Sequence, residues 1–379
     1  MKILFLISSG SFNEKYPSKK GVNGPEIRFR EYLKLTDLNA YFYLLYGNGV
    51  LINDFKELEN RRQNINLINI VNGKFLNYSW NLIKFLSKNR VNAVHSQGPI
   101  SYDLLNIIFS FFFRYKSIVT RPILRIDSKF TNIRSILLHI IDRLLISRTN
   151  FLIAISNYHY KHLSKYINIK NLRLITNGVD LNRFKSKTQK SLNFNKQNPL
   201  KISFIAQFTD FKKQDLLLDC LKFLKDYFIE LHFIGTGPNI DVIKNLSKKN
   251  KNTRHNIIFH GHIKDTSQIL KVMHINCLFS SREGLPVSMI EALACGCALI
   301  GSNKGAMNEI IIREQNGFLL RSNNDIIDIS NKIKELYVDK SLLNYMMNNS
   351  IKISKKFDIK KMISFYNDVY KETIDYDKK

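Results

Sequence analysis

The stretch SREGLPVSMIEALACGCALIGS (281–302) decides the fold, because it reads as a loop, a helix and a strand in succession. Val287 to Ala294 contains no helix breaker, and Gly296 stands where a left-handed glycine commonly ends a helix. HINCLFSS (274–281) before the loop and ALIGS (298–302) after the helix are typical of buried strands. This order predicts a parallel sheet with the loop at the carboxyl end of a strand, where α/β sheets bind ligands.

Two carboxylates, Glu283 and Glu291, lie eight residues apart in this stretch. Eight residues are slightly more than two helical turns, so we expect Glu283 in the loop and Glu291 inside the helix. The helix N-terminus between them offers backbone N–H groups and a positive dipole end, which suit a phosphate. A ligand with hydroxyls at both ends and phosphate in the middle, such as a nucleotide-sugar, fits this arrangement. The alternative is a surface helix with two solvated glutamates, which the strand context disfavours.

Short β-like runs alternate with longer helical runs over most of the 379 residues. The strand candidates are 2–8, 40–46, 65–70, 92–96, 117–121, 151–156 and 172–176, then 201–208, 231–235, 256–262, 274–281, 298–302 and 318–320. The polar stretch KSKTQKSLNFNKQNP (185–199) separates the two series. Such alternation predicts an α/β protein with two doubly wound domains. We expect an N-terminal domain over 1–185, a linker over 186–199, a C-terminal domain over 200–355, and a last helix within 356–379 that returns to the first domain.

Composition bounds the class of protein. Hydrophobic residues make up 44% of the chain, as in a globular protein with a large core. The longest apolar run, LLNIIFSFFF (104–113), is shorter than the roughly 18 residues that a membrane span needs. MKILFLISS (1–9) has too short an apolar core for a signal peptide and fits a first buried strand. The four cysteines form no CxxC pair, which fits a reduced, cytoplasmic compartment.

The net charge of +27 attracts polyanions. No nucleic-acid-binding motif occurs, so we expect no nucleic-acid partner. IIFSFFFRYK (107–116) and IRSILLHIIDRLLISR (133–148) combine apolar faces with Arg and Lys, as helices on an anionic membrane surface do. A core-facing helix is the alternative, which we favour for 133–148 and weigh equally for 104–116.

Seven segments resemble, in order, the motifs of the family-4 retaining nucleotide-sugar glycosyltransferases, and together they span most of the chain. They are ITNGVDLNRF (175–184), FKKQDLLLDC (211–220), FIGTGP (233–238), FHGHIKD (259–265), SSREGLPVSMIEALACG (280–296), GAMNEII (305–311) and NGFLL (316–320). The resemblance implies the GT-B fold, with two Rossmann-like doubly wound domains facing across a cleft. It also implies a nucleotide-diphosphate sugar as donor substrate, with neither a metal nor a cofactor.

The resemblance also implies roles for individual residues. Glu283 would accept hydrogen bonds from the donor-sugar hydroxyls, and Glu291 would accept them from both ribose hydroxyls. Lys212 or its neighbour Lys213 would neutralise the charge of the diphosphate. The backbone of the loop before the helix would hold the distal phosphate, through Gly284, Leu285, Pro286 and Val287. Ile263 stands where the family's backbone contacts the base. Gly21 and Gly24 resemble the glycine loop that faces the acceptor and the donor phosphates.

One departure from the family concerns charge. Gln207 stands about five residues before Lys212, where the family usually has an arginine. A neutral amide cannot supply that charge, so either Lys213, Arg282 or another cation compensates, or the leaving group is stabilised less.

Histidines give weaker signals. His95 ends the strand candidate 92–96 and either contacts a substrate or is bonded to backbone as a structural histidine. Arg121, Arg125 and Asp127 follow the next strand, where some relatives place a substrate-facing side chain. His260 and His262 share one face of a strand, but no third ligand is evident, so we expect no metal.

The sequence therefore predicts a glycosyltransferase of hexosyltransferase type that adds a sugar to a growing surface glycan of lipopolysaccharide, capsule or O-antigen type. A lipid-linked acceptor, and attachment of this cytoplasmic protein to the anionic inner face of the plasma membrane, belong to the same hypothesis. The alternatives are a non-catalytic protein that binds nucleotide-sugars or polyanions, and a sugar-nucleotide epimerase of the same fold.

Overall fold

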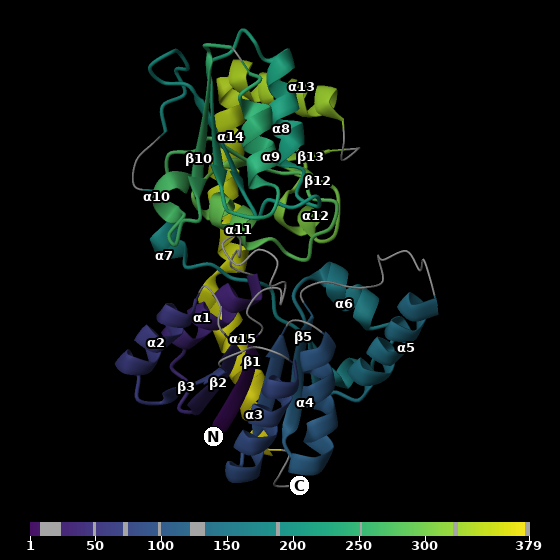
Figure 1. Cartoon of the computed structure of the whole chain (residues 1–379). Helices are drawn as coiled ribbons and strands as arrows, with labels where there is room; N and C mark the ends of the chain where they lie inside the picture. Colours follow the sequence, from purple (N-terminus) through teal and green to yellow (C-terminus); the bar gives the residue numbers. More distant parts are fainter. Residues whose placement is uncertain are drawn as a thin grey trace. The chain divides into compact units, whose positions relative to one another are not determined.

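The computed structural model describes residues 1–7, 24–47, 51–70, 75–97, 100–121, 133–186, 190–250, 252–320 and 325–375. The chain divides into two units, one formed by Met1–Asn177 with Lys361–Lys379 and the other by Gly178–Lys360 (Figure 1). Each unit holds one parallel sheet with helices between successive strands. Among the described helices, none is both long and apolar enough to cross a membrane.

The first unit contains a seven-stranded sheet in the order β3-β2-β1-β4-β5-β6-β7. Its strands are β1 (Lys2–Ile7), β2 (Tyr41–Gly47), β3 (Ile65–Ile70), β4 (Ala93–Gln97), β5 (Lys116–Arg121), β6 (Phe151–Ala154) and β7 (Leu172–Leu174). Its helices are α1 (Gly24–Leu35), α2 (Ile52–Arg61), α3 (Phe75–Lys88), α4 (Ile100–Phe113), α5 (Ile133–Ser147), α6 (Asn157–Leu163) and most of α15 (Ile359–Asp375). The strand order reverses between β1 and β4, which is the mark of a doubly wound sheet.

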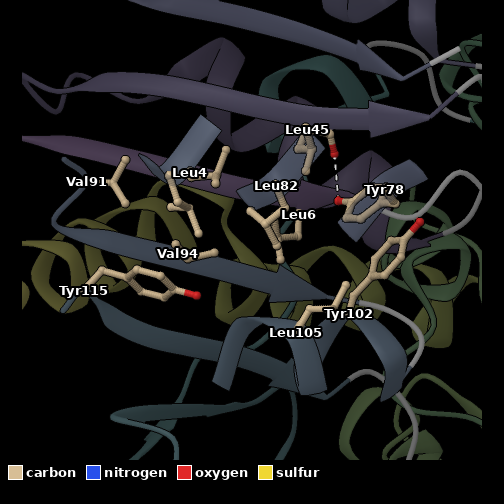
Figure 2. Packing of buried hydrophobic residues seen from close by; sticks show 11 residues of the cluster. Leu4, Leu6, Leu45, Tyr78, Leu82, Val91, Val94, Tyr102, Leu105 and Tyr115 are labelled. Carbon is tan, nitrogen blue, oxygen red and sulfur yellow. Dashed lines mark hydrogen bonds between the residues drawn. The ribbon is translucent and has the colours of Figure 1, made fainter. Parts of the chain in front are cut away.

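The central strand β1 is buried on both faces, as parallel strands between two helix layers are. Leu4 and Leu6 point toward α3 and α4, where the rings of Tyr78 and Tyr102 stack at 4.2 Å between centroids (Figure 2). The Tyr78 hydroxyl donates to the carbonyl of Leu45 at 3.0 Å, so its buried oxygen is satisfied.

The opposite face of β1 packs against α1 and α15. Phe5 lies 4.7 Å from Phe29 of α1 and 6.0 Å from Tyr370 of α15, measured between ring centroids. The Tyr32 hydroxyl of α1 donates to Asn367 Oδ1 of α15 at 2.7 Å. The chain thus comes back from the second unit to complete the core of the first, in the region where we expected the last helix to return.

The second unit contains a six-stranded sheet in the order β10-β9-β8-β11-β12-β13. Its strands are β8 (Leu200–Ile205), β9 (Ile229–Ile234), β10 (His255–Gly261), β11 (Ile275–Leu278), β12 (Ala298–Ser302) and β13 (Gly317–Leu320). Its helices are α7 (Leu181–Phe184), α8 (Gln214–Cys220), α9 (Ile240–Ser247), α10 (Ser267–Leu270), α11 (Val287–Ala294), α12 (Met307–Ile310), α13 (Ile326–Val338) and α14 (Lys340–Ser354). Two doubly wound parallel sheets confirm the predicted α/β fold class.

The polar segment expected to be a linker is attached to the second unit. Lys190 Nζ donates to the carbonyl oxygens of Met273, Cys295 and Gly296 at 2.5, 2.8 and 3.0 Å. Two of these carbonyls lie just after α11, where a cation complements the negative end of the helix dipole. The two units divide between Asn177 and Gly178 rather than at residue 185.

Candidate functional site

The loops after β8 and β11 meet at the carboxyl edge of the second sheet, because these two strands are neighbours at the point where the strand order reverses. The Ser281 N–H donates to the carbonyl of Phe211 at 2.9 Å and joins one loop to the other. The Arg282 guanidinium lies 5.0 Å from the centre of the Phe211 ring. This edge is where doubly wound sheets bind ligands, as the sequence predicts.

Lys212 and Glu283 form an ion pair across these two loops. Lys212 Nζ donates to Glu283 Oε1 at 2.5 Å, and the Glu283 side chain is 8% exposed. The structure thus brings together the predicted diphosphate-binding lysine and the predicted sugar-binding carboxylate. Lys213 has φ of 56° and precedes α8, so the backbone turns sharply there. The Gln207 carbonyl accepts from Gln214 Nε2 at 2.9 Å, which ties the loop after β8 to α8.

The loop that carries Glu283 leads directly into α11. Gly284, Leu285 and Pro286 are buried, and the helix begins at Val287. The first N–H groups of any helix lack intrahelical acceptors and face the same direction, so this end suits an anion. Gly305 packs directly against the backbone of this loop, since a Cβ on this residue would lie 1.8 Å from the Glu283 carbonyl oxygen. The role of Gly305 was not predicted, although its motif was recognised.

Glu291 lies within α11 and is half-buried. Thr266 Oγ1 donates to Glu291 Oε2 at 2.9 Å. Thr266 precedes α10 in the same connection as Ile263, the residue predicted to lie near the base. The connection between β10 and α10 therefore adjoins the predicted ribose-binding carboxylate, and Thr266 is a contact that sequence reasoning missed.

The G-x-G-P turn supports the loop after β8 through close backbone contacts. A Cβ on Gly235 would lie 2.0 Å from the Ala206 carbonyl oxygen, and one on Gly237 would lie 2.5 Å from the Phe208 carbonyl oxygen. The Phe208 N–H donates to the Thr236 carbonyl at 3.0 Å. Glycine is required here because no side chain fits between the two backbones.

His95 lies in the first unit and is fully buried. Its Nδ1 is 2.6 Å from the Tyr370 hydroxyl, and its Nε2 is 2.8 Å from Thr120 Oγ1. Burial, helped by the nearby Arg28 charge, holds the pKa of His95 well below its usual range. Both ring nitrogens of His95 are thus occupied by hydrogen bonds within the first unit, as in a structural histidine, and its predicted contact with a substrate stays a prediction.

Several other predicted residues belong to the first unit or lie outside the described residues. Gly24 begins α1 in the first unit, while Gly21, Arg125 and Asp127 lie outside the described residues. Arg121 is buried in ion pairs with Asp103 and Asp142, at 3.1 and 2.5 Å. Within the described part of the chain, no three His, Cys, Asp or Glu side chains gather to hold a metal ion.

Comparison with known proteins identifies the class. Residues 185–353 match the family model described as glycosyl transferases group 1. An uncharacterised glycosyltransferase of Methanocaldococcus jannaschii is 24% identical over 387 residues, which cover 93% of this chain and 96% of the relative. Another from that organism is 26% identical over 225 residues, or 59% of this chain and 60% of the relative. The capsular polysaccharide biosynthesis glycosyltransferase CapH of Staphylococcus aureus is 26% identical over 300 residues, which cover 77% of this chain and 81% of CapH.

Solved structures share the fold along the whole chain. HepE of Anabaena in complex with UDP superposes with a TM-score of 0.75 at 20% identity, covering 99% of this chain and 100% of HepE. Its complex with UDP-glucose gives 0.75 at 18% identity, with the same coverage. Sucrose-phosphate synthase of Thermosynechococcus elongatus gives 0.78 at 14% identity, with 99% of each chain covered. The fold and the family match together define a glycosyltransferase of the GT-B fold.

Proposed function

We propose that this protein transfers a sugar from a nucleotide-diphosphate sugar to a hydroxyl of a growing surface glycan, with retention at the anomeric carbon. The observation that carries the proposal is the Lys212–Glu283 pair beside the start of α11, with Glu291 farther along the same helix. The similarity to CapH and to HepE, which was solved with UDP and with UDP-glucose, supports the donor class and the surface glycan.

Glu291, Lys212 and Glu283 each bind a different part of the donor, namely the ribose, the diphosphate and the sugar. Glu291, oriented by Thr266, accepts hydrogen bonds from the two ribose hydroxyls. The positive end of α11 and Lys212 face the diphosphate, whose negative charge grows as the sugar leaves. When donor binds, Lys212 exchanges the Glu283 carboxylate for phosphate oxygens, and Glu283 becomes available to the sugar hydroxyls.

The transfer step needs only these groups and the two substrates. The bond between the anomeric carbon and the phosphate oxygen breaks, and a bond from the same carbon to the acceptor oxygen forms. The acceptor approaches from the side of the leaving group, so its hydroxyl proton passes to the departing diphosphate. Lys213 and Arg282 lie in the same two loops as Lys212 and Glu283, and they supply positive charge there in place of the arginine that the family usually has at position 207.

We also propose that the protein works at an anionic membrane surface, which it reaches through α4 and α5. These helices pack against each other and expose a set of large apolar side chains, namely Ile108, Phe111, Phe112, Ile136, Leu137, Ile140, Ile141 and Leu144. Phe111 and Phe112 are 62% and 75% exposed, which is unusual for phenylalanine. The core-facing interpretation of 133–148 is therefore wrong for these α5 residues. The net charge of +27 favours anionic lipid as the partner of this apolar face.

The test of transfer is release of nucleoside diphosphate from a panel of nucleotide-sugars, with and without glycan acceptors. We expect acceptor-dependent release that falls by about 100-fold or more in Lys212→Met and Glu283→Gln. Lys222→Met is the matched control, because Lys222 forms an exposed pair with Asp219 on the surface of the same unit. Binding without release, whatever the acceptor, would favour the non-catalytic alternative, and formation of an epimerised sugar without any acceptor would favour the epimerase.

The test of membrane binding is co-sedimentation with vesicles that contain or lack anionic lipid. We expect binding to anionic vesicles that Phe111→Ser with Phe112→Ser abolishes. The exposed Phe365→Ser on α15 is the control and should bind as the unchanged protein does. Equal sedimentation of the double variant and the unchanged protein would contradict the proposal.

A further inference from the structure

Arg28 is a buried cation whose hydrogen bonds are incomplete. It lies on α1, its side chain is almost entirely shielded from solvent, and Nη2 donates to Asn177 Oδ1. Its Nε and Nη1 atoms have no hydrogen-bond acceptor among the described residues. Burial lowers the pKa of Arg28, but an arginine side chain stays protonated in proteins. A buried guanidinium with two unpaired donors is unfavourable unless an anion completes it.

Gln97 is a second incomplete group at the same end of the sheet. It is the last residue of β4, next to β1 where the strand order reverses, and it is buried. Neither its amide oxygen nor its amide nitrogen has a partner in the described part of the chain. Side chains alternate along a strand, so Gln97 shares a face with His95, whose ring lies 4.8 Å from Phe29 of α1. Gln97 therefore lies on the face that α1 and its Arg28 cover, at the carboxyl edge.

Two more groups surround Arg28. Tyr366 of α15 adjoins the Arg28 guanidinium and opposes the lowering of its pKa, but the buried Tyr366 hydroxyl makes no hydrogen bond of normal geometry among the described residues. His159 of α6 is buried, and its Nδ1 is likewise unpaired there. Burial, the neighbouring His162 and Arg28 lower the pKa of His159 to about 4, so the ring is neutral at pH 7 and its Nδ1 is free to carry a proton toward a ligand.

This concentration of unpaired atoms at one place is informative. Twelve buried side-chain nitrogen and oxygen atoms have no hydrogen-bond partner among the described residues, and six of them belong to Arg28, Gln97, His159 and Tyr366. Native proteins satisfy most buried polar groups, and those left over point to a missing ion, water or ligand. Donors from α1, β4, α6 and α15 that surround a permanent positive charge suit an anion with several oxygens. A neutral sugar would bring no negative charge to the guanidinium of Arg28.

We propose that Arg28, Gln97, His159 and Tyr366 form a phosphate-binding site in the first unit, and that this site takes a phosphate group carried by the acceptor. The proposal rests on the proposed transferase function, because it assigns the acceptor to the unit that does not hold the donor groups Lys212, Glu283 and Glu291. The chemical class of acceptor is then a glycan or lipid linked through a phosphate or diphosphate ester. The same oxygens could come from free diphosphate or from the donor, so the experiment separates these sources.

The experiment measures binding of three probes to the full chain by calorimetry: UDP, inorganic diphosphate, and a short isoprenyl diphosphate with its uncharged alcohol as control. We expect the isoprenyl diphosphate to bind in the presence of saturating UDP. Arg28→Met should weaken that binding by about 10- to 100-fold and leave UDP binding unchanged. Glu291→Gln should do the reverse. Arg173→Met, which removes an outer ion pair with Glu372 in the same unit, should change neither.

Each other result has a defined meaning. Equal affinity of Arg28→Met and the unchanged protein for the isoprenyl diphosphate would overturn the proposal. Competition between UDP and the isoprenyl diphosphate for one site would overturn it too, because the phosphate would then belong to the donor site. Equal affinity for inorganic diphosphate and its isoprenyl ester, both lost in Arg28→Met, would support the phosphate site and assign it to free diphosphate instead of the acceptor. If the unchanged protein bound the isoprenyl diphosphate but not UDP, the result would count against the proposed function and not against this site.

A second variant, Gln97→Leu, distinguishes the loss of a ligand contact from misfolding of Arg28→Met. Gln97→Leu keeps the charge of Arg28 and removes only the amide, so we expect it to weaken isoprenyl diphosphate binding by about tenfold. Arg28→Met should unfold at the same temperature as the unchanged protein or above it in the absence of ligand, because it removes an unpaired buried charge. A structural arginine would show the opposite, a lower unfolding temperature with diphosphate binding intact in Gln97→Leu.

Discussion

The contribution of the Lys212–Glu283 ion pair to the free energy of unfolding can be measured by replacing each partner alone and both together. Its atoms lie 2.5 Å apart, and the side chains of Lys212 and Glu283 are 24% and 8% exposed. The perturbations are Lys212→Met, Glu283→Gln and the two together. The quantity of interest is the coupling free energy. It is the change in unfolding free energy of the double variant minus the sum of the changes in the two single variants.

The expected coupling follows from this geometry. A hydrogen bond to a charged group contributes about 1.5–3 kcal/mol, whereas an exposed ion pair contributes about 0.2–1 kcal/mol. The carboxylate is well shielded but the lysine still meets water, so we expect about 1–2 kcal/mol. Lys222 and Asp219 form a matched control pair at 2.6 Å with 71% and 40% exposure, and their coupling should be below about 0.5 kcal/mol.

The assay is urea unfolding of each set of four proteins, followed by far-ultraviolet circular dichroism, with and without saturating UDP. Trp80 lies in the first unit, so its fluorescence is not a suitable signal for this pair. If Lys212 exchanges Glu283 for phosphate, UDP should reduce the coupling of the site pair and leave the control pair unchanged. A coupling as small as that of the control would refute our interpretation of the pair, and a coupling that UDP does not alter would refute the exchange step.

Three further predictions concern stability. Gly235→Ala should lower the free energy of unfolding by more than about 2 kcal/mol, because its Cβ would lie 2.0 Å from a backbone oxygen. The Cβ of Gly261→Ala meets nothing within 4 Å, so this variant should lose only about 1 kcal/mol. Urea unfolding of both variants measures the difference. Burial raises the pKa of Asp103 to about 6, above its ordinary 3.8, so the folded state holds this proton more tightly. Stability should therefore fall as the pH rises from about 4 to about 6, and Asp103→Asn should flatten that slope in thermal unfolding; an unchanged slope would contradict the assignment. Lys190→Met removes one donor from each of three carbonyls and should cost about 2–3 kcal/mol in urea unfolding, against less than about 0.5 for the exposed Lys196→Met.

The strand and helix pattern was largely predictable because each element carries its own signal. The candidate 65–70 coincides with β3, and the stretch from Val287 to Ala294 coincides with α11. Errors occurred at the carboxyl ends of strands, where 201–208 and 274–281 extend beyond β8 and β11. Phe208 and Phe279 explain them, since they are apolar and buried but belong to the ligand-facing loops.

Contacts between distant residues could not be predicted. A polar segment looks like a linker unless one knows that the carbonyls capped by Lys190 lie at least 83 residues away in the chain. His95 looked equally suited to a site or to the core, and its partner Tyr370 lies 275 residues away. Lys212 and Glu283 were predictable as members of motifs, whereas Thr266, Gly305 and Arg28 were identified only from their contacts and burial.

The return of α15 to the first unit has a consequence for synthesis on the ribosome. Domains generally fold in the order in which they emerge, the N-terminal one first. Here the aromatic core around Phe5 and the bond from Tyr32 to Asn367 require residues that are translated after the entire second unit. The second unit is therefore the first that can finish folding. Until then, the part of the sheet face that α15 covers beside α1 stays exposed, and a nascent chain stalled before α15 would present that part to chaperones.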